Sequence, residues 1–315
     1  MPLLFLQATI VWQHCAELPM ELTTGKTAVI DGKVYCGGGE TDNRGNEFNV
    51  FCYDLAKDKW TTLPPLSVKF FGLGQVNSKL VAIGGVEPVK ESNEVYSFDE
   101  QSQKWKRTIP PMPTARWSPG VLSLQSALVV AGGLTMSSSY IAAVEIFKAD
   151  TSQWYRTDPL PTNCCNVSLA VINDICYVLG GFKAPVNHLN QALYASVDDL
   201  LGNAVPANLA THNNTSDTQS TWKTLSNTPI KFPIAAVLAG KLLTPGGRGE
   251  GGDPEKEVYM YSPSINSWIH FGDLPAPRAS IALAVLSSTR ILVIGGWKSQ
   301  GVRVNTVYKG TYMLC

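Results

Sequence analysis

Positively charged side chains recur in two kinds of loop along this 315-residue chain. Four of them stand just before short apolar runs: Lys69, Arg116, Lys231 and Arg278. Others lie in loops that follow Gly-Gly pairs, together with two large aromatic residues: Arg44, Lys183, Arg248, Lys298, Arg303, Tyr140 and Trp297. Arginine and lysine bind carboxylates through charge-assisted hydrogen bonds, and aromatic residues often anchor interfaces. If these loops converge, they predict a basic, aromatic cup that binds an acidic peptide or loop of a partner protein.

Catalytic and metal-binding motifs are not recognisable in the sequence. The four histidines, His14, His188, His212 and His270, are scattered, whereas a metal site needs clustered ligands. Cys164-Cys165 lacks the spacing of a zinc site, and there is no nucleophile elbow or phosphate-binding loop. We therefore predict no catalytic residue, no cofactor and no metal.

Overall charge excludes two classes of partner. Basic and acidic residues number 25 each, so no global field draws the protein to nucleic acid or to an anionic membrane. No run approaches the roughly 20 apolar residues of a membrane span. The seven cysteines are an odd set without paired spacing, which is typical of free thiols in a reducing compartment. We expect a cytoplasmic, monomeric protein with a protein or peptide partner.

The elements that position these loops are set by a repeat. A Gly-Gly pair ends an apolar run six times, at intervals of about 48 residues with one longer interval. The pairs are Gly37-Gly38, Gly84-Gly85, Gly132-Gly133, Gly180-Gly181, Gly246-Gly247 and Gly295-Gly296. An aromatic strand, a tryptophan and a proline-containing exit follow in most units; the tryptophans are Trp60, Trp105, Trp154, Trp222 and Trp268. Each unit therefore predicts four short antiparallel strands, a to d.

This pattern resembles the kelch repeat, and the resemblance spans the whole chain. It implies an all-β, six-bladed propeller with four antiparallel strands per blade. Trp12 has no Gly-Gly pair before it, and Tyr308 has no tryptophan after it, so the N-terminal strand is expected to complete the last blade. The expected boundaries are residues 1–20 for that closing strand, then 21–66, 67–112, 113–161, 162–228, 229–277 and 278–315. Residues 198–220, rich in Asn, Ser, Thr and Ala, are expected to form a mobile surface loop between strands c and d.

In such a blade the b–c and d–a loops share one face, where long loops on a rigid frame usually carry binding. The chain also resembles the propeller of BTB–kelch ubiquitin-ligase adaptors, which use this face to capture degradation motifs, although it has no helical BTB or BACK segment. Substrate recognition for ubiquitination and a stand-alone scaffold are both open. Kelch units often carry an arginine at the d–a position, so Arg116 and Arg278 have a structural alternative. Acidic loop residues such as Glu40 would also neutralise part of the cup.

Two further alternatives use the same cup. Kelch-like propellers include galactose oxidase and sialic-acid mutarotases, and a mutarotase needs only acid, base and cationic groups in its pocket. A carbohydrate-binding propeller without chemistry would use Trp117 or Trp297 as a stacking platform. Sugar binding would tolerate salt, whereas acidic-peptide binding would weaken with ionic strength.

Overall fold

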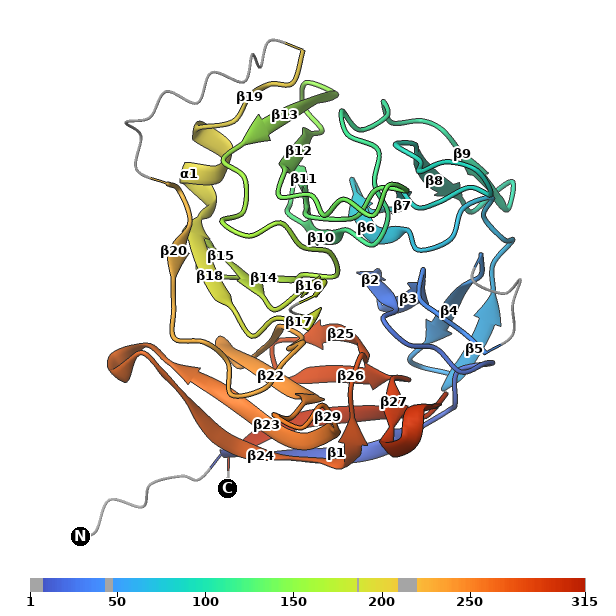
Figure 1. Cartoon of the computed structure of the whole chain (residues 1–315). Coiled ribbons are helices and arrows are strands. Elements are labelled where there is room, and N and C mark those ends of the chain that lie inside the picture. The colour runs from blue at the N-terminus through green and yellow to red at the C-terminus, as the bar shows by residue number, and fades with distance from the viewer. Residues whose placement is uncertain (1–7, 43–47, 186, 209–219, 315) are drawn as a thin grey trace, which may run out of the picture.

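The computed structural model describes residues 8–42, 48–185, 187–208 and 220–314. Within them, six antiparallel sheets stand as blades around a central axis (Figure 1). The predicted all-β, six-bladed propeller with four antiparallel strands per blade is confirmed. No helix in this part of the chain is long and apolar enough to cross a membrane.

The blades repeat one strand order. Strands a are β2 (Lys26–Ile30), β6 (Gly72–Val76), β10 (Gly120–Ser123), β14 (Ser168–Ile172), β21 (Ala236–Leu238) and β25 (Ala282–Ser287). Strands b are β3 (Lys33–Gly37), β7 (Lys79–Ile83), β11 (Ala127–Ala131), β15 (Ile175–Leu179), β22 (Lys241–Arg248) and β26 (Arg290–Ile294). Strands c are β4 (Val50–Asp54), β8 (Val95–Asp99), β12 (Val144–Lys148), β18 (Ala192–Ser196), β23 (Pro254–Ser262) and β29 (Val307–Leu314). Strands d are β5 (Lys59–Thr62), β9 (Lys104–Lys106), β13 (Gln153–Thr157), β20 (Lys223–Thr224), β24 (Ser267–Arg278) and β1 (Ala8–Cys15).

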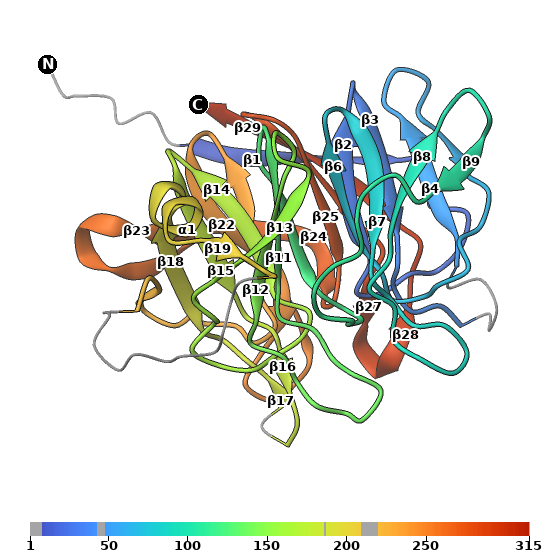
Figure 2. The same ribbon diagram turned by 90° about the horizontal axis from the view of Figure 1, so that it is seen from above.

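Successive a strands contact one another around the axis, in the order β2, β6, β10, β14, β21, β25 and back to β2. Two short ribbons, β16–β17 (Phe182–Lys183, Asn187–His188) and β27–β28 (Trp297–Lys298, Val302–Arg303), extend from one face (Figure 2). They are built from b–c loops of blades 4 and 6. A 3-10 turn, Ser299–Gly301, joins the second pair, and another, Pro263–Ile265, joins β23 to β24.

The hydrophobic core is divided among the blade interfaces. Each of six clusters of buried residues joins side chains from two neighbouring blades, as Val34 of blade 1 and Ala284 of blade 6 do. The b strands are the most buried, and every residue of β11 is buried. Because each sheet buries both faces against its neighbours, the ring is stabilised only when it is complete.

The blade tryptophans connect each blade to the one before it. Each indole N–H donates to a carbonyl in the exit segment of the preceding blade, at 2.8–3.0 Å. The donor and acceptor residues are Trp12 and Asp273, Trp60 and Ala16, Trp105 and Pro64, Trp154 and Pro110, Trp222 and Asp158, and Trp268 and Ser226. The repeat therefore reflects one interblade hydrogen bond that is made six times. The packing of each tryptophan ring stabilises the same contact between blades.

The seam between the chain ends is the predicted one. β1 pairs antiparallel with β29 from Ala8 opposite Leu314 to Cys15 opposite Val307, and the two strands lie side by side in Figure 1. The backbone N–H of Leu18 also donates to the carbonyl of Asn305 at 2.9 Å. The prediction that the N-terminal strand completes the last blade is confirmed.

Glycine is required where a strand b ends against the next blade. Gly132 has φ +65°, and a Cβ placed on it would lie 2.4 Å from the carbonyl oxygen of Cys164. Gly84 stands in the same relation to the carbonyl of Arg116, and in blade 1 this position belongs to Gly38, not Gly37. The Gly-Gly pair of blade 1 is thus Gly38-Gly39, one residue later than predicted, because three consecutive glycines hide the register.

We expect Gly132→Ala to lower the free energy of unfolding by about 2–3 kcal/mol, because a left-handed backbone and a carbonyl contact both oppose a Cβ there. Urea denaturation measures the change. Gly240→Ala is the matched control, since Gly240 has φ +69° with nothing within 4 Å of an added Cβ, and should cost only about 1 kcal/mol. Equal costs for the two variants would contradict the proposed contact.

The segment between strands c and d of blade 4 is more ordered than predicted. Helix α1 (Val197–Gly202) begins directly after β18, with the side chain of Ser196 accepting a hydrogen bond from the N–H of Asp199. Strand β19 (Val205–Pro206) then pairs with β13 and adds a fifth strand to blade 3. The prediction of a mobile loop is wrong for these residues; residues 209–219 lie outside the described part. Ser196, which is followed by acidic residues and leucines, is a helix N-cap signal that the sequence-based prediction did not use.

Candidate functional site

The d–a and b–c loops meet in a ring around the central axis. In every blade the residue ahead of strand a forms a bridge with the residue that follows the second glycine. The bridges are Thr23 with Glu40, Lys69 with Val86, Trp117 with Leu134, Cys165 with Phe182, Lys231 with Arg248, and Ala279 with Trp297. These six pairs fix the side chains that surround the mouth of the propeller.

The next residue of each d–a loop adopts a left-handed backbone with φ between 50° and 56°: Thr24, Phe70, Ser118, Asn166, Phe232 and Ser280. Such values are unusual for residues with a Cβ and persist only where the surroundings enforce them. Here neighbouring loops provide the restraint, because the N–H of Thr24 donates to Ser280, that of Ser118 to Phe70 and that of Asn166 to Ser118, at 2.7–2.9 Å. The site therefore rests on a rigid loop ring.

A cavity of about 400 Å³ opens inside this ring, and we call it the cup. It is lined by Thr23, Thr24, Glu40, Trp117, Leu134, Cys165, Asn166, Phe182, His188, Phe232, Arg248, Ser280, Trp297, Gly301 and Arg303. Aromatic and apolar side chains form much of its wall, and a few polar groups point into it. This combination is typical of a binding site for a peptide or a small molecule.

Arg248 is the central cation of the cup. Its guanidinium stacks on Trp297 at 3.7 Å from the ring centroid, and its Nη1 donates to the carbonyl of Gly252 at 3.1 Å. The Nε atom is buried without a hydrogen-bond partner, and within the described residues no acidic side chain pairs with Arg248. Burial lowers the pKa of Arg248 but leaves it charged at neutral pH. The cup thus contains an oriented, uncompensated guanidinium.

Two neutral aromatic side chains, His188 and Trp117, also line the cup. His188 packs edge-on against Phe182 and Phe232, and its pKa falls to about 4 because of burial and then the nearby Arg248 and Lys231. It is therefore neutral at pH 7. The indole N–H of Trp117 is buried without a partner, beside Phe70 at 5.4 Å between ring centroids. His188 can therefore hydrogen-bond a ligand without adding charge, and Trp117 contributes its ring to the wall.

The part of the cup wall between blades 6 and 1 is neutralised. Arg303 forms ion pairs with Glu40, at 3.1 Å, and with Asp42. Both acidic residues belong to blade 1, so this pair of contacts closes the rim between blades 1 and 6. Arg303 does line the cup, but its charge is already balanced by protein carboxylates.

Sequence comparison now decides the family. The model of the KLHDC2/KLHL20/DRC7 Kelch-repeats domain matches residues 24–201, more than half of the chain. The chain belongs to the kelch-repeat family. Kelch repeats and the propeller fold support a protein-interaction module in the general sense.

Individual relatives agree with this assignment. Kelch repeat and BTB domain-containing protein 1 of camelpox virus is 21% identical over 272 residues, which cover 84% of this chain and 44% of that protein. Kelch-like protein 41b of Danio rerio is 27% identical over 230 residues, covering 70% and 34%. The kelch propeller thus spans less than half the length of these curated relatives. The solved structure of YjhT has a TM-score of 0.72 at 15% identity, covers 95% of this chain and 99% of its own, and shows the shared fold alone.

Two predicted contact residues of the kelch propeller are placed elsewhere. Lys69 and Lys231 occupy the bridge position of their loops, but Arg116 and Arg278 stand one residue earlier. At that earlier position the other blades carry buried residues: Leu22, Val68, Cys164 and Ile230. Because neighbouring residues of an extended segment point to opposite sides, a one-residue offset turns these arginines inward.

Arg116 is 0% exposed and Arg278 is 5% exposed. Arg116 Nη1 donates to the carbonyls of Gly132 and Ala143 at 2.9 Å, and its Nη2 lies 2.8 Å from Oε2 of Glu145. Arg278 donates to the carbonyl of Pro277 at 2.8 Å and to Oγ1 of Thr306 at 3.0 Å. The prediction that these two arginines contact a partner is wrong; they connect loops within the kelch propeller.

The remaining predicted residues lie on the loops of the same face without lining the cup. Lys231 and Lys298 are exposed, and Lys69, Lys183 and Tyr140 are half-buried. Lys69 stands over the ring of Phe70 at 5.5 Å, and Tyr140 packs near Phe182 at 6.1 Å between centroids. Arg44 lies outside the described residues.

Of the residues predicted for the site, Arg248, Trp297 and Arg303 come together in the cup. His188 and Phe182 were missed. Phe232 and Trp117 were both expected to pack between blades, with Trp117 also weighed as a stacking platform for a sugar. The sequence could have indicated Phe182, because it directly follows a Gly-Gly pair and so occupies a bridge position. Trp117 occupies the corresponding bridge position of a d–a loop.

Proposed function

We propose that this kelch propeller is a monomeric, non-catalytic interaction module whose cup binds a partner segment that presents a carboxylate beside an apolar side chain. The observation that carries the proposal is Arg248, whose guanidinium is held on Trp297 and forms no ion pair with an acidic side chain of the described residues, whereas Glu40 of the same cup is paired with Arg303. A guanidinium without a carboxylate of its own can bind an incoming carboxylate through charge-assisted hydrogen bonds.

The walls of the cup support the apolar half of this ligand. Phe182, Phe232, Leu134 and Trp117 all line the cup and offer nonpolar surface. Lys231 and Lys298, exposed on the surrounding loops, would attract an acidic segment at longer range.

A cellular role follows from the resemblance to BTB–kelch adaptors, which supports substrate recognition for ubiquitination; a scaffold would use the same cup. The six cysteines of the described residues are free, which supports a cytoplasmic location. The cellular role and the cytoplasmic location are both part of the proposal.

The test is selection from a random peptide display library with the wild-type propeller, followed by affinity measurement of the recovered peptides. We expect enrichment of Asp and Glu, and at least an about 30-fold loss of affinity in Arg248→Glu, because an interfacial charge pair is replaced by repulsion. Binding should weaken as ionic strength rises. Measurement is by fluorescence polarisation of labelled peptides.

The matched control is Lys104→Glu, which makes the same charge change at the exposed start of β9, next to the c–d turn of blade 2. It should leave affinity within about twofold. Recovery of peptides without acidic enrichment, or equal binding by Arg248→Glu, would overturn the proposal. Salt-independent binding of free sugars would instead favour the carbohydrate alternative.

A further inference from the structure

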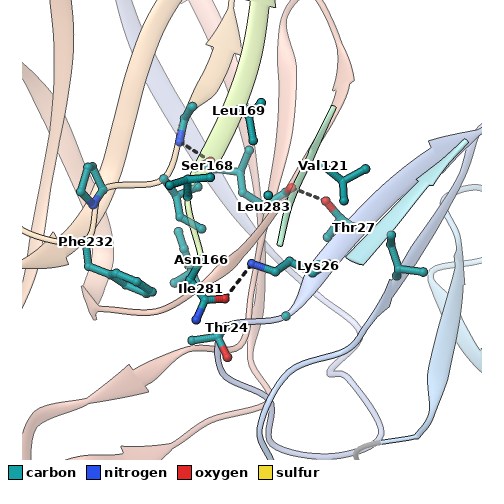
Figure 3. A pocket seen from close by; sticks show the side chains of 17 residues that line it. Thr24, Lys26, Thr27, Val121, Asn166, Ser168, Leu169, Phe232, Ile281 and Leu283 are labelled. Atoms are coloured by element: carbon teal, nitrogen blue, oxygen red, sulfur yellow. Dashed lines mark hydrogen bonds between the residues drawn. The ribbon is translucent and has the colours of Figure 1, made fainter. Parts of the chain in front are cut away.

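A second, smaller cavity continues from the cup into the propeller axis. It measures about 140 Å³, and it shares Thr24, Asn166 and Phe232 with the cup, so the two spaces meet at the ring of left-handed residues. Figure 3 shows the side chains that line this channel, most of them from a strands and d–a loops. A small molecule in the cup would reach the channel directly.

Lys26 crosses this channel. It is the first residue of β2 in blade 1, and its Nζ donates to Oδ1 of Asn166 in the d–a loop of blade 4 at 3.0 Å (Figure 3). In the ring order of a strands, β2 contacts β6 and β25, whereas β14 contacts β10 and β21, so blades 1 and 4 face each other across the axis. The amine therefore lies at the floor of the cup.

No other blade carries a charge at this position. The residue two places after the left-handed residue is Lys26 in blade 1, and its counterparts are Gly72, Gly120, Ser168, Ile234 and Ala282. The repeat thus does not need a long cationic side chain here. Blade 1 places one where small or apolar residues otherwise leave the channel open.

The amine has no counterion in the channel. Among the described residues that line it, none is acidic, and the polar ones are Thr24, Thr27, Asn166 and Ser168. Thr24 and Thr27 donate their hydroxyl protons to backbone carbonyls. The nearest ionisable neighbour is the thiol of Cys165, whose own pKa burial raises to about 12, so that it carries no charge at pH 7. Burial lowers the pKa of Lys26 to about 8, with Cys165 a weaker opposing influence.

We propose that Lys26 is a carbonyl-reactive amine that forms an imine with small aldehydes entering the channel through the cup. The unprotonated Nζ attacks the carbonyl carbon, the resulting carbinolamine loses its hydroxyl as water, and a C=N bond joins Nζ to the former aldehyde carbon. The neutral Nζ gives up both of its protons, and with the former aldehyde oxygen they make up the one water released. Oδ1 of Asn166 accepts a hydrogen bond from Nζ and orients its lone pair for the attack. Such activation of a desolvated lysine amine is known chemistry for proteins in general.

The test uses the whole chain with propanal and sodium cyanoborohydride, which reduces the imine to a stable secondary amine. Peptide mapping by mass spectrometry then gives the rate of labelling at each lysine. At pH 7 an amine with a pKa of about 8 is unprotonated roughly 300 times more often than one at 10.5. Allowing for its lower intrinsic nucleophilicity, we expect Lys26 to be labelled at least ten times faster than the exposed Lys59 and Lys104.

The pH profile is a second readout. The labelling rate of Lys26 should rise with a midpoint near pH 8, the pKa to which burial lowers its amine. The other titratable or charged groups that face the channel and cup are Cys165, His188, Arg248, Glu40 and Arg303. The pKa of His188, lowered to about 4, and that of Cys165, raised to about 12, both lie outside that window. The midpoint would therefore belong to Lys26 itself.

Lys26→Arg should remove the fast-labelled peptide, and Lys69→Arg, which alters another lysine of the loop ring, should leave the labelling of Lys26 unchanged. The wild-type pattern alone is decisive if Lys26→Arg fails to fold. Labelling of Lys26 no faster than that of Lys59, complete protection of Lys26, or a midpoint above pH 10 would each overturn the proposal. None of these outcomes depends on whether the cup binds peptides.

Discussion

Replacing Arg116 by methionine is expected to lower the free energy of unfolding by about 3–5 kcal/mol, because it leaves the carboxylate of Glu145 buried without its main partner. Both side chains are 0% exposed and lie 2.8 Å apart. Arg156, at 3.4 Å, and the hydroxyl of Thr114, at 2.6 Å, also contact Glu145 and would compensate only in part. Urea denaturation followed by tryptophan fluorescence measures the loss.

The matched control is Lys69→Met. Lys69 is a cation of the preceding d–a loop, where it stands at the bridge position, and it makes no ion pair among the described residues. It should change stability by less than about 0.5 kcal/mol. The double variant Arg116→Met with Glu145→Leu should recover much of the loss, since it removes both buried charges. A cost below about 1 kcal/mol for Arg116→Met would show that the pair does not bind these loops together.

The same comparison separates structure from binding. Because Arg116 does not reach the cup, a folded Arg116→Met propeller should bind selected peptides as the wild type does. Arg248→Glu should do the reverse, losing binding with little change in stability. Arg116 stands in a d–a loop and Arg248 in a b–c loop of the same face, but only Arg248 lines the cup.

The sequence predicts the strands of the blades better than it predicts the loops between them. The glycine and tryptophan period marks the ends of b strands and the packing of d strands, and these positions have few alternatives, as the carbonyl 2.4 Å from a Cβ on Gly84 illustrates. Blade number and the seam could therefore be predicted. In the d–a loops no alternation of apolar and polar residues sets the register, so Arg116 was aligned with Lys69 although it stands one place earlier.

The sequence is equally limited for the cup, where it predicts single residues but not their contacts. Arg248 and Trp297 could be named because each follows a Gly-Gly pair directly. Their contact could not, because it joins blade 5 to blade 6 through the curvature of the ring. Two other contacts also join residues far apart in the chain: the ion pair of Arg303 with Glu40, and the hydrogen bond from Lys26 to Asn166. No local sequence pattern connects the partners of either contact.

Deleting residues 1–14 is expected to abolish the cooperative folded state. The deletion removes all but one residue of β1, and with it the eight-residue pairing to β29 and the hydrogen bond from Trp12 to the carbonyl of Asp273. It leaves β29 as an open edge and exposes apolar surface of the cluster between blades 5 and 6, where Ile10 and Trp12 pack. Because domains are stable by only about 5–15 kcal/mol, loss of the closing strand exceeds what the ring can absorb. Circular dichroism melting and size-exclusion chromatography measure the outcome.

Deleting only residues 2–7 is the matched control, because β1 begins at Ala8 and its pairing with β29 is kept. We expect this variant to melt within a few degrees of the full chain. A synthetic peptide of residues 8–14 added to the longer deletion should restore a melting transition whose midpoint rises with the logarithm of the peptide concentration, since binding to the folded state stabilises it by mass action. A protein lacking residues 1–14 that melts like the full chain would show that blade 6 does not need its N-terminal strand, and that the ring is held closed by the three C-terminal strands alone.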